Sequence, residues 1–322
     1  MMTAEFVEVP FQVQKPQDGL RVDAYLALRL QRYSRSTVQK MIGDGLVSVA
    51  ERIVKPATRV CAGQTVVIRY PRHDEPPPSV DRLEVLFEDN HLLAVDKTGH
   101  VLSHPTDKVV ENTVTTILRK QLPALKLHLV HRLDRETSGV LLLAKDPRTA
   151  RLINEAFFDH SVEKTYWALA AGRVAWARKT VDAPIGRAGG EIKVRQAVGA
   201  ADGAQTAVTN FRRLEAGTAL SLVAARPETG RLHQIRVHLA HLGHPVLGDK
   251  LYTHDGSYYM KAVRKELTDA DLDALGAPRQ MLHARTLEFM HPITKKKLRL
   301  RSPLPEDFRA CLERAGLEAP RG

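Results

Sequence analysis

Residues 131–145 read HRLDRETSGVLLLAK, in which a charged turn is followed at once by an uninterrupted apolar run. A short apolar run after a Thr-Ser-Gly turn is typical of a buried β-strand. Asp134 is therefore expected on a loop that the strand holds in place while the side chains of the loop stay free. An isolated loop aspartate usually makes a local turn or pairs with a neighbour such as Arg135. The role of Asp134 depends on what other segments bring to it.

Strand-like and helical segments alternate irregularly on both sides of this stretch, without an internal repeat. This order predicts an α+β domain with a mixed, largely antiparallel sheet and flanking helices. Residues 252–280 read as a helical insertion with a capping-type start at Thr268, and we find no chemistry in them. The strands are expected at 82–89, 91–97, 139–145, 164–172, 219–226 and 297–302, and the helices at 113–122, 147–158 and 232–243.

The residues before 80 are more basic than the rest of the chain. Between Gly19 and Tyr70, nine Lys or Arg stand against three acidic residues, which is over half of the net charge of +11. A basic cluster suits a surface that follows phosphate groups, although charge alone is also typical of a solvated face. The pattern predicts helices over 22–30 and from Ser34 or Ser36 to Gly43, with Gln39 completing a capping box. Two strands, separated by a turn at Gly63, are expected to follow.

This segment resembles the S4 RNA-binding domain in its Ser-Arg-Ser helix start, its glycine before a valine-rich strand and its closing glycine turn. The sequence VAER at 49–52 replaces the usual Val-Asn-Gly turn of that family, so the hairpin is expected to be reshaped. The resemblance implies RNA binding, for which Arg32, Arg35 and Lys40 are the candidate residues. Three consecutive prolines then stop helix and central strand. The expected parts are an N-terminal extension at 1–18, the S4-like α/β module at 19–70, a proline-rich linker at 71–81 and a larger domain at 82–322.

Two further segments supply what an active carboxylate requires, a cation to keep it ionised and a weaker acid to move a proton. In KTYWAL, residues 164–169, strand alternation places Tyr166 on one face and both its neighbours on the other. In RPETGRLHQIRVHLAHLG, a turn leads into a helix on which His233 and Arg236 share a face. Taken singly, Tyr166 is typical of the core and Arg236 of the surface.

Together these segments resemble the RluA-type pseudouridine synthases, from about Leu83 to Leu304. HRLDRETSG looks like the nucleophile motif of that family, KTYWAL like its tyrosine motif, and GRLHQIRVHLAHLGHPVLGD like its arginine motif. The resemblance implies that uridine in RNA is detached from C1′, turned and rejoined through C5. It implies that Asp134 is the catalytic carboxylate, Tyr166 the proton-handling phenol and Arg236 the ion-pair partner, that Arg132 enters the RNA stack, and that His233 contacts RNA; Arg135 receives no role.

The implied chemistry suits these residue types. An aspartate with an ordinary pKa of about 3.9 is anionic at neutral pH and can attack or stabilise C1′ with no cofactor. A phenol with a pKa of about 10 is a poor base in water, and we expect burial beside a cation to bring it into use. A uridine stacked in RNA must first be flipped out, and a wedge such as Arg132 can fill the gap.

Other kinds of site are not indicated. A dense histidine group, His233, His238, His241 and His244, lacks an H-E-x-x-H pattern and a nearby cysteine, so no metal site is expected. GHPVLGDK at 243–250 has Asp249 where a phosphate loop needs lysine, so no nucleotide site is expected. Cys61 and Cys311 lie too far apart in sequence to indicate a disulfide framework. We expect a cytoplasmic protein without a membrane span or a leader, and we favour a monomer.

Two alternatives stay open for the RNA partner and for the activity. The three motifs describe the chemistry and not the target, so a tRNA synthase is possible, although the S4-like module and a basic strand favour large-subunit ribosomal RNA. A non-catalytic, ribosome-associated RNA-binding protein is the alternative from another class, which the set of Asp134, Tyr166 and Arg236 disfavours. The basic strand carries Lys295, Lys297, Arg299 and Arg301 at alternate positions.

Overall fold

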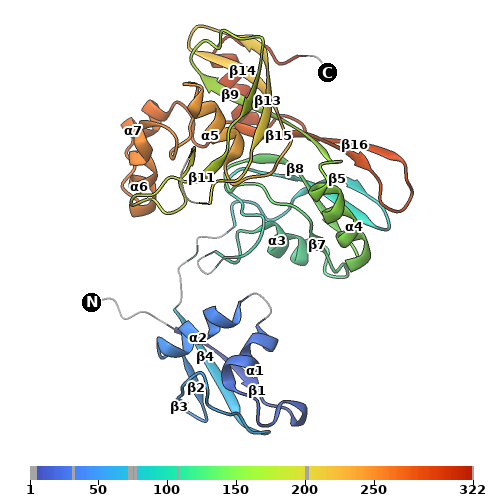
Figure 1. Ribbon diagram of the computed structural model, residues 1–322, viewed down its shortest axis with the longest axis vertical. Helices are drawn as coiled ribbons and strands as arrows, with labels where there is room; N and C mark the ends of the chain where they lie inside the picture. Colours follow the sequence, from blue (N-terminus) through green and yellow to red (C-terminus); the bar gives the residue numbers. More distant parts are fainter. Residues whose placement is uncertain are drawn as a thin grey trace. The chain divides into compact units, whose positions relative to one another are not determined.

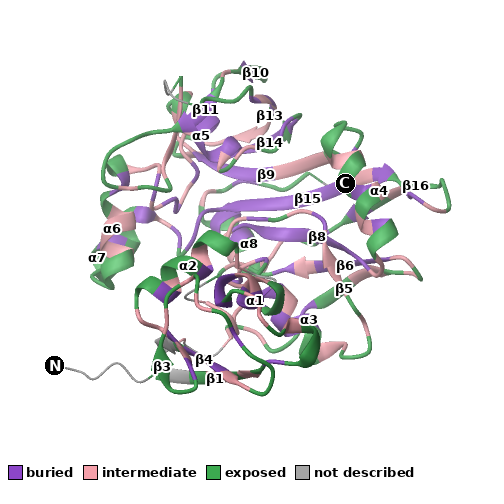
Figure 2. Ribbon diagram, turned by 60° about the horizontal axis from the view of Figure 1, so that its bottom comes forward, coloured by how far each residue is buried: buried purple, intermediate pink, exposed green. Residues whose placement is uncertain are grey.

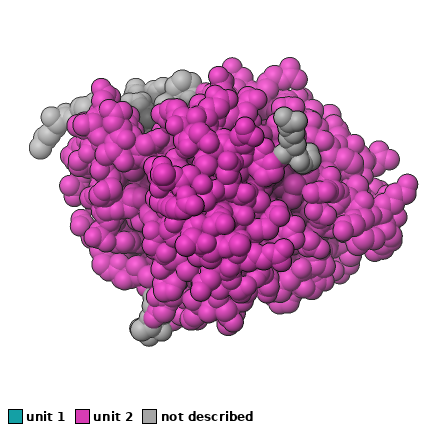
Figure 3. Space-filling view, turned by 90° about the horizontal axis from the view of Figure 1, so that it is seen from above, with its two compact units in different colours: residues 1–74 teal, residues 75–322 magenta. Residues whose placement is uncertain are grey.

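The chain divides into two compact units, residues 1–74 and residues 75–322 (Figure 1). We describe a computed structural model of residues 6–30, 33–71, 75, 78–106, 109–199 and 203–320. Arg32, one of the candidate RNA contacts, lies outside the described residues. Figure 3 shows the surface of the second unit, which is the larger of the two.

The first unit has a four-stranded sheet in the order β1-β4-β2-β3. Its outer strand β1 comes from the segment that we expected to be an extension, so that expectation needs correction. β1 pairs antiparallel with β4 from Phe6↔Pro71 to Gln12↔Thr65, and its proline is tolerated because the strand lies at the edge. The strands are β1 (Phe6–Gln12), β2 (Val47–Val49), β3 (Arg52–Ile53) and β4 (Thr65–Pro71).

Two helices, α1 (Val22–Arg29) and α2 (Arg35–Gly43), complete this unit and pack on each other. Ser34 caps α2, because its side chain accepts a hydrogen bond of 3.2 Å from the amide of Thr37. The expected capping box is wrong in its second half, since Gln39 donates to the Asp23 carboxylate at 2.7 Å. The core beneath consists mainly of aliphatic side chains from both helices and the sheet.

The VAER turn between β2 and β3 is a two-residue hairpin. Val49 pairs with Arg52, and the two residues between them both have left-handed backbones, Ala50 with φ 45° and Glu51 with φ 66°. Such a turn matches the twist of the flanking strands but favours Asn or Gly at these positions. The substituted sequence therefore keeps a tight turn at the cost of backbone strain.

The second unit has a ten-stranded, largely antiparallel sheet, which confirms the predicted fold class. Its order is β10-β13-β14-β9-β15-β8-β6-β5, with β16 beside β15 and β7 beside β8, and its one parallel pair among the described residues is β15 with β8. The strands are β5 (Glu84–Glu88), β6 (Leu92–Lys97), β7 (His128–Leu129), β8 (Ser138–Ala144), β9 (Glu163–Ala171), β10 (Arg178–Asp182), β13 (Val208–Ala216), β14 (Leu220–Pro227), β15 (Leu282–Met290) and β16 (Lys297–Arg301).

The apolar run at 140–144 forms the buried strand β8 (Figure 2). Its alternate side chains enter two cores, because Leu141 joins the cluster that contains Ile117 of α3, and Leu142 joins the one that contains Ile153 of α4. A strand covered on both faces reads as a continuous apolar run, which explains the pattern that the sequence shows. The helices are α3 (Val114–Gln121) and α4 (Pro147–Phe158).

The remaining elements lie around this sheet. Helix α5 (Gln234–His241) packs on β13 and β14, and α8 (Glu306–Arg314) follows β16. The short strands β11 (Ile185–Arg187) and β12 (Gln196–Val198) pair with each other. The predicted insertion contains α6 (Ser257–Arg264) and α7 (Asp269–Leu275), and Thr268 makes the expected capping box. In the part of the chain that the structure describes, no helix is long and apolar enough to cross a membrane.

Candidate active site

Asp134 lies on the loop between β7 and β8, where its neighbour anchors the backbone. The amide of Leu133 donates to the Ser103 hydroxyl at 3.0 Å, and that hydroxyl donates to the Leu133 carbonyl at 2.9 Å. Leu133 itself is buried in the core. The amide of Thr137 closes the turn by donating to the Asp134 carbonyl at 3.1 Å. The Asp134 side chain is thereby held at the rim of the sheet with 27% of its surface exposed.

Arg236 joins two carboxylates from distant parts of the chain. Its Nη1 donates to Oδ2 of Asp134 at 2.9 Å. Its Nε and Nη2 donate to the two oxygens of Asp249 at 2.7 and 2.9 Å. Such a paired contact fixes the plane of the guanidinium, because both groups are rigid and planar. Asp249 thus sets the direction in which Arg236 presents its remaining donor to Asp134.

Asp249 is a site residue that the sequence interpretation missed. We treated it only as a misfit in a phosphate loop, although it ends the arginine motif. Its side chain is fully buried and also accepts hydrogen bonds from the amides of Leu251 and Tyr252, at 2.9 and 3.2 Å. A buried carboxylate needs such partners to remain charged. Its position directly after a turn in the motif was the signal that could have found it.

The surroundings of Asp134 favour its ionised form. Burial alone would raise the pKa of this carboxyl, but the charge of Arg236 and its hydrogen bond hold the pKa below its ordinary value. A hydrogen bond from Gln280 acts in the same direction. The ring of Tyr252 lies 5.0 Å from the guanidinium carbon of Arg236, which shields the ion pair on one side. Asp134 is therefore an anion at neutral pH.

Tyr166 lies on β9 and faces the same cavity as Asp134. Its neighbour Trp167 points to the opposite face and packs in another core, as strand alternation predicts. Burial and the negative charge of Asp134 raise the pKa of the Tyr166 phenol. The expectation that a nearby cation brings this phenol into use by lowering its pKa is wrong, because burial, the larger effect, and the charge of Asp134 both raise the pKa.

The cavity that holds these groups has a volume of about 110 Å³. Asp134, Tyr166 and Arg236 all line it, although they come from a loop, a strand and a helix. The two candidate RNA contacts of this unit, Arg132 and His233, line it as well. Arg132 is exposed at its edge. The structure thus brings together all five candidate residues of the second unit.

His233 is a neutral group in this cavity. It begins α5 with a left-handed backbone, φ 58° and ψ 17°, and its Nδ1 lies 2.9 Å from the hydroxyl of Tyr252. Burial and the charge of Arg236 lower the pKa of His233 to about 4. At neutral pH it can therefore offer RNA a hydrogen bond but not a positive charge.

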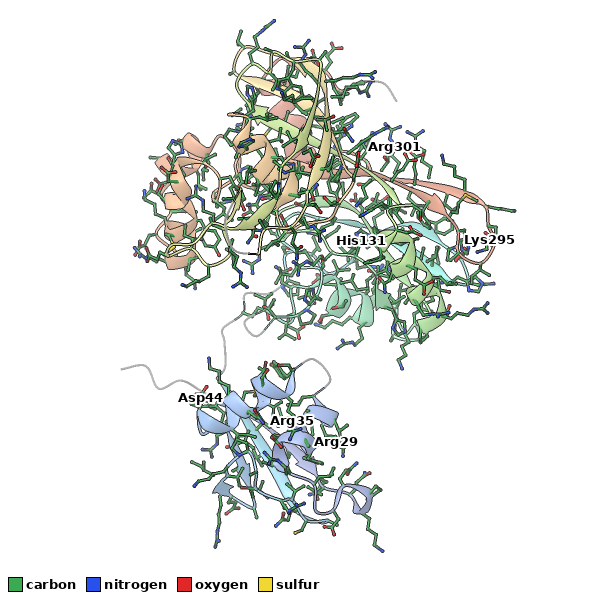
Figure 4. All side chains as sticks on the ribbon, in the orientation of Figure 1. Arg29, Arg35, Asp44, His131, Lys295 and Arg301 are labelled. Carbon is green, nitrogen blue, oxygen red and sulfur yellow. The ribbon has the colours of Figure 1, made fainter. Side chains whose placement is uncertain are left out.

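The candidate RNA contacts of the first unit differ in their surroundings. Arg35 donates through Nε and Nη2 to the buried carboxylate of Asp23, at 3.1 to 3.3 Å, while 53% of its side chain is exposed (Figure 4). Hydrogen bonds from Arg21, Gln39 and Arg35 hold the pKa of Asp23 well below its usual range despite burial. Lys40 lies exposed on α2. Asp23 thus compensates part of the positive charge of Arg35, and this ion pair belongs to the fold of the first unit.

The histidine group forms no metal site in the described part of the chain, where no group of three or more His, Cys, Asp or Glu is placed to hold an ion. His238 lies 2.9 Å from the Thr209 hydroxyl, and Nδ1 of His244 lies 2.9 Å from the Ala171 carbonyl. These histidines contact different strands of the sheet. Their density in sequence comes from one helix and the turn after it.

The basic strand is β16, which continues from a turn at Lys295 (Figure 4). Lys297 and Arg299 are exposed, as expected from their alternation with buried or half-buried leucines. Both also lie near Glu288 of β15, at 3.7 and 3.3 Å, so part of their charge is compensated.

Residues 91–241 match the family model described as RNA pseudouridylate synthase, and residues 20–66 match the S4 domain. The chain is 33% identical to ribosomal large subunit pseudouridine synthase D of Pseudomonas aeruginosa, over 95% of this chain and 94% of that protein. It is 31% identical to ribosomal large subunit pseudouridine synthase C of Vibrio cholerae, over 93% of this chain and 94% of that protein. A solved structure, human RNA pseudouridylate synthase domain containing 4, has a TM-score of 0.59 and 29% identity, over 74% of this chain and 95% of that one.

Proposed function

The chain belongs to the RNA pseudouridylate synthase family and carries an S4 domain, and we propose that it converts specific uridines of large-subunit ribosomal RNA to pseudouridine through the carboxylate of Asp134. The observation that carries the proposal is the fixed ion pair between Asp134 and Arg236 beside Tyr166 in one cavity. A protein that only bound RNA would not need a carboxylate there, because a carboxylate repels phosphate groups.

Asp134 is suited to act at C1′ of the flipped uridine. Its ionised carboxylate can attack this carbon, or stabilise the positive charge that forms there, as the bond to N1 of uracil breaks. The hydrogen bond from Nη1 of Arg236 to Oδ2 keeps the carboxylate oriented. The detached base then turns, and its C5 forms the new bond to C1′, which releases the carboxylate of Asp134 where that had bonded to the same carbon. The isomerisation is balanced without an oxidant or a second substrate, so it needs no cofactor.

Tyr166 is proposed to move the proton that leaves C5 once the carbon–carbon bond has formed. Because its raised pKa keeps the phenol neutral in the free protein, it must give up its own proton as it receives the one from C5, and N1 of the base, which has lost its bond to C1′, is the final acceptor of a proton. Before that step the same hydroxyl can donate a hydrogen bond to the detached base. A role in proton transfer explains why a phenol faces the carboxylate here.

Arg132 is proposed to replace the flipped uridine in the RNA stack. Its exposed side chain lies at the edge of the cavity, two residues before Asp134 in the same loop. Extrusion of a base costs a few kcal/mol, which a planar cation in the gap can offset in part. One short loop would thus supply both the side chain that takes the place of the flipped uridine and the carboxylate that acts on it.

The choice of large-subunit ribosomal RNA rests on the named relatives and on the S4 domain. Pseudouridine mapping of total RNA from cells with and without the gene tests it. We expect defined uridines of large-subunit ribosomal RNA to lose the modification and to regain it when the gene is restored. Loss in tRNA alone would favour a tRNA synthase instead, and an unchanged map would favour the non-catalytic alternative.

A further inference from the structure

Helix α6 of the insertion has an apolar face that the rest of the described chain covers only in part, since Tyr259 and Ala262 are half-buried and Val263 is exposed. None of its eight residues is buried, and 61% of Val263 is exposed. Tyr259, Ala262 and Val263 lie at positions i, i+3 and i+4 and therefore share one face. In Figures 1 and 2, α6 lies beside α7 at one side of the second unit, away from α4. A helix with one unburied apolar face is expected to have a partner.

This face lines a second cavity of about 500 Å³. Two further exposed apolar side chains line the same cavity, Val194 with 42% and Leu232 with 37% of their surface exposed. Exposed apolar side chains scattered singly need no explanation, but their convergence on one cavity does. One wall of the cavity is thus apolar and includes an aromatic ring, that of Tyr259.

The opposite wall belongs to the active site. Arg132, Asp134, His233 and Arg236 line both cavities, so the second continues directly from the first. The exposed Arg135 also lines the second cavity. Lys250 is there too, although it donates to Glu136 at 2.9 Å. The cavity therefore combines an apolar, aromatic wall with a charged one, on which four Arg or Lys side chains outnumber the carboxylates of Asp134 and Glu136.

We infer that this second cavity holds a nucleotide next to the target uridine, with its base against Tyr259 and its phosphate towards Arg135. The inference rests on the proposed function of the first cavity. A uridine held at Asp134 stays joined to both its neighbours in the RNA, so an adjoining nucleotide has to lie where the first cavity opens. An aromatic ring beside a cation is the usual arrangement for an unpaired nucleotide. The insertion then helps to select the uridine, and Arg135 gains a role.

The test uses the full chain and a synthetic fragment of large-subunit ribosomal RNA centred on a uridine that mapping identifies. A set of fragments carries a single abasic nucleotide at each position near that uridine. The variants are Tyr259→Ala and its control Tyr258→Ala, which removes a half-buried tyrosine of the same helix that does not line the cavity. The measured quantity is kcat/KM for pseudouridine formation.

We expect Tyr259→Ala to lower kcat/KM on the intact fragment by about tenfold, the worth of one base on an aromatic ring. An abasic nucleotide at one position should lower kcat/KM of the wild-type protein by about the same factor. The same abasic fragment should lower kcat/KM of Tyr259→Ala little further, because both changes remove the same contact. Tyr259→Phe should restore the rate, and Tyr258→Ala should match the wild type. Val263→Glu, at an exposed position on the same helix face as Tyr259, should also lower the rate by placing a charged group on the wall that contacts the base.

Independent losses from Tyr259→Ala and from every abasic nucleotide would overturn the inference. It would equally fail if Tyr258→Ala lost as much as Tyr259→Ala, or if Tyr259→Ala and Val263→Glu were both fully active. In these cases the wild-type protein is still active, so the proposed function survives. A wild-type protein that did not modify the intact fragment would overturn both.

Discussion

The guanidinium of Arg236 is fixed by the carboxylate of Asp249 and donates a further hydrogen bond to the carboxylate of Asp134. This arrangement of its donors defines the site. Asp249 takes two of its N–H groups and is itself fixed by backbone amides. Asp134 accepts a hydrogen bond from Nη1 of Arg236, and its side chain stays partly exposed. Removal of the Asp249 carboxylate is therefore expected to lower the stability of the second unit, whereas removal of the Asp134 carboxylate is expected to abolish the reaction.

Asp249→Asn should destabilise the second unit. The substitution removes the fully buried carboxylate charge that pairs with two N–H groups of Arg236 and leaves only the partly exposed Asp134, and breaking one side of a buried ion pair costs about 3 kcal/mol or more. Urea unfolding measures the change. Asp255→Asn is the control. Asp255 is fully exposed, and its ion pair with Arg195, at 3.6 Å, is of the kind that adds little to stability. Equal stability of the two variants would mean that Asp249 does not anchor Arg236.

The residues of the first cavity show how far sequence reasoning reaches at this scale. Asp134, Tyr166 and Arg236 were grouped by motif, and they do line one cavity. Asp249 was missed because a buried partner is revealed by geometry and not by residue type. The direction of the Tyr166 pKa shift was also missed, since it depends on how deeply the phenol is buried and on how near Asp134 lies.

At the scale of elements, predicted strands and helices are most accurate where one local signal is strong. Helix α4 begins and ends as predicted, with Asp146 as its cap and a proline at its first position. Strand β15 was not predicted, although it lies in the middle of the sheet. It buries polar side chains such as His283 and Arg285, the latter over the ring of Trp167 at 5.0 Å. The tertiary contacts that pair such groups in part, such as the one of 3.0 Å between His283 Nδ1 and the Ser138 hydroxyl, cannot be read from an apolar pattern.

The junction of β8 with β15 requires glycine at position 139. Gly139 has φ 114°, and a Cβ there would overlap the carbonyl of Ala284. Gly139→Ala should therefore lose far more stability than Gly189→Ala, whose φ is 74° but whose Cβ would meet nothing within 4 Å. The control carries only the backbone strain of about 1 kcal/mol or more. Thermal unfolding compares them, and equal losses would show that the strand junction can move.

His131 joins the active-site loop to β8 and α4 as a neutral acceptor. Its Nε2 accepts from the amide of Leu142 at 2.9 Å, and its ring lies 4.9 Å from that of Phe157. Burial and the charge of Lys164 lower the pKa of His131 to about 3. The unfolded chain, with an ordinary histidine pKa of about 6.5, then binds more protons than the folded one between these values, so stability falls as pH drops below about 6.5.

His131→Gln should reduce this acid sensitivity, because an amide oxygen can replace Nε2 but does not titrate. We expect the wild-type protein to lose about 1 to 2 kcal/mol more than the variant between pH 7.5 and pH 5. Urea unfolding at both pH values measures the difference. The same pH dependence in both proteins would mean that His131 already carries a proton in the fold.

At the scale of the whole molecule, the chain divides at Asp74 and Glu75, within the segment expected to be a linker. Glu75 belongs to the second unit, since its carboxylate accepts from the amides of Val110, Glu111 and Asn112. The residue composition indicated the boundary, but only these contacts show on which side Glu75 lies. A truncation should therefore begin at Glu75 and not after it.

The fragment 75–322 should fold and remain active but bind RNA more weakly than the full chain. The binding constant of the fragment should also depend less on salt. Each phosphate contact with single-stranded RNA adds about −0.7 to the slope of log K against the logarithm of the salt concentration, and the fragment makes fewer such contacts. The defect should shrink at saturating RNA, since the first unit adds binding without touching the reaction. Activity against RNA concentration at two salt levels tests this. Identical curves for both proteins would mean that the first unit does not capture the substrate.

The measurement that bears on Asp134 itself is a single-turnover assay of Asp134→Asn with saturating protein and the mapped ribosomal RNA fragment. Asparagine keeps the size of the side chain and an acceptor for Arg236 but removes the negative charge. We expect no pseudouridine above background, while RNA affinity and thermal unfolding stay close to those of the wild-type protein. Pseudouridine formed at a rate near that of the wild type would show that the carboxylate of Asp134 does not carry the reaction.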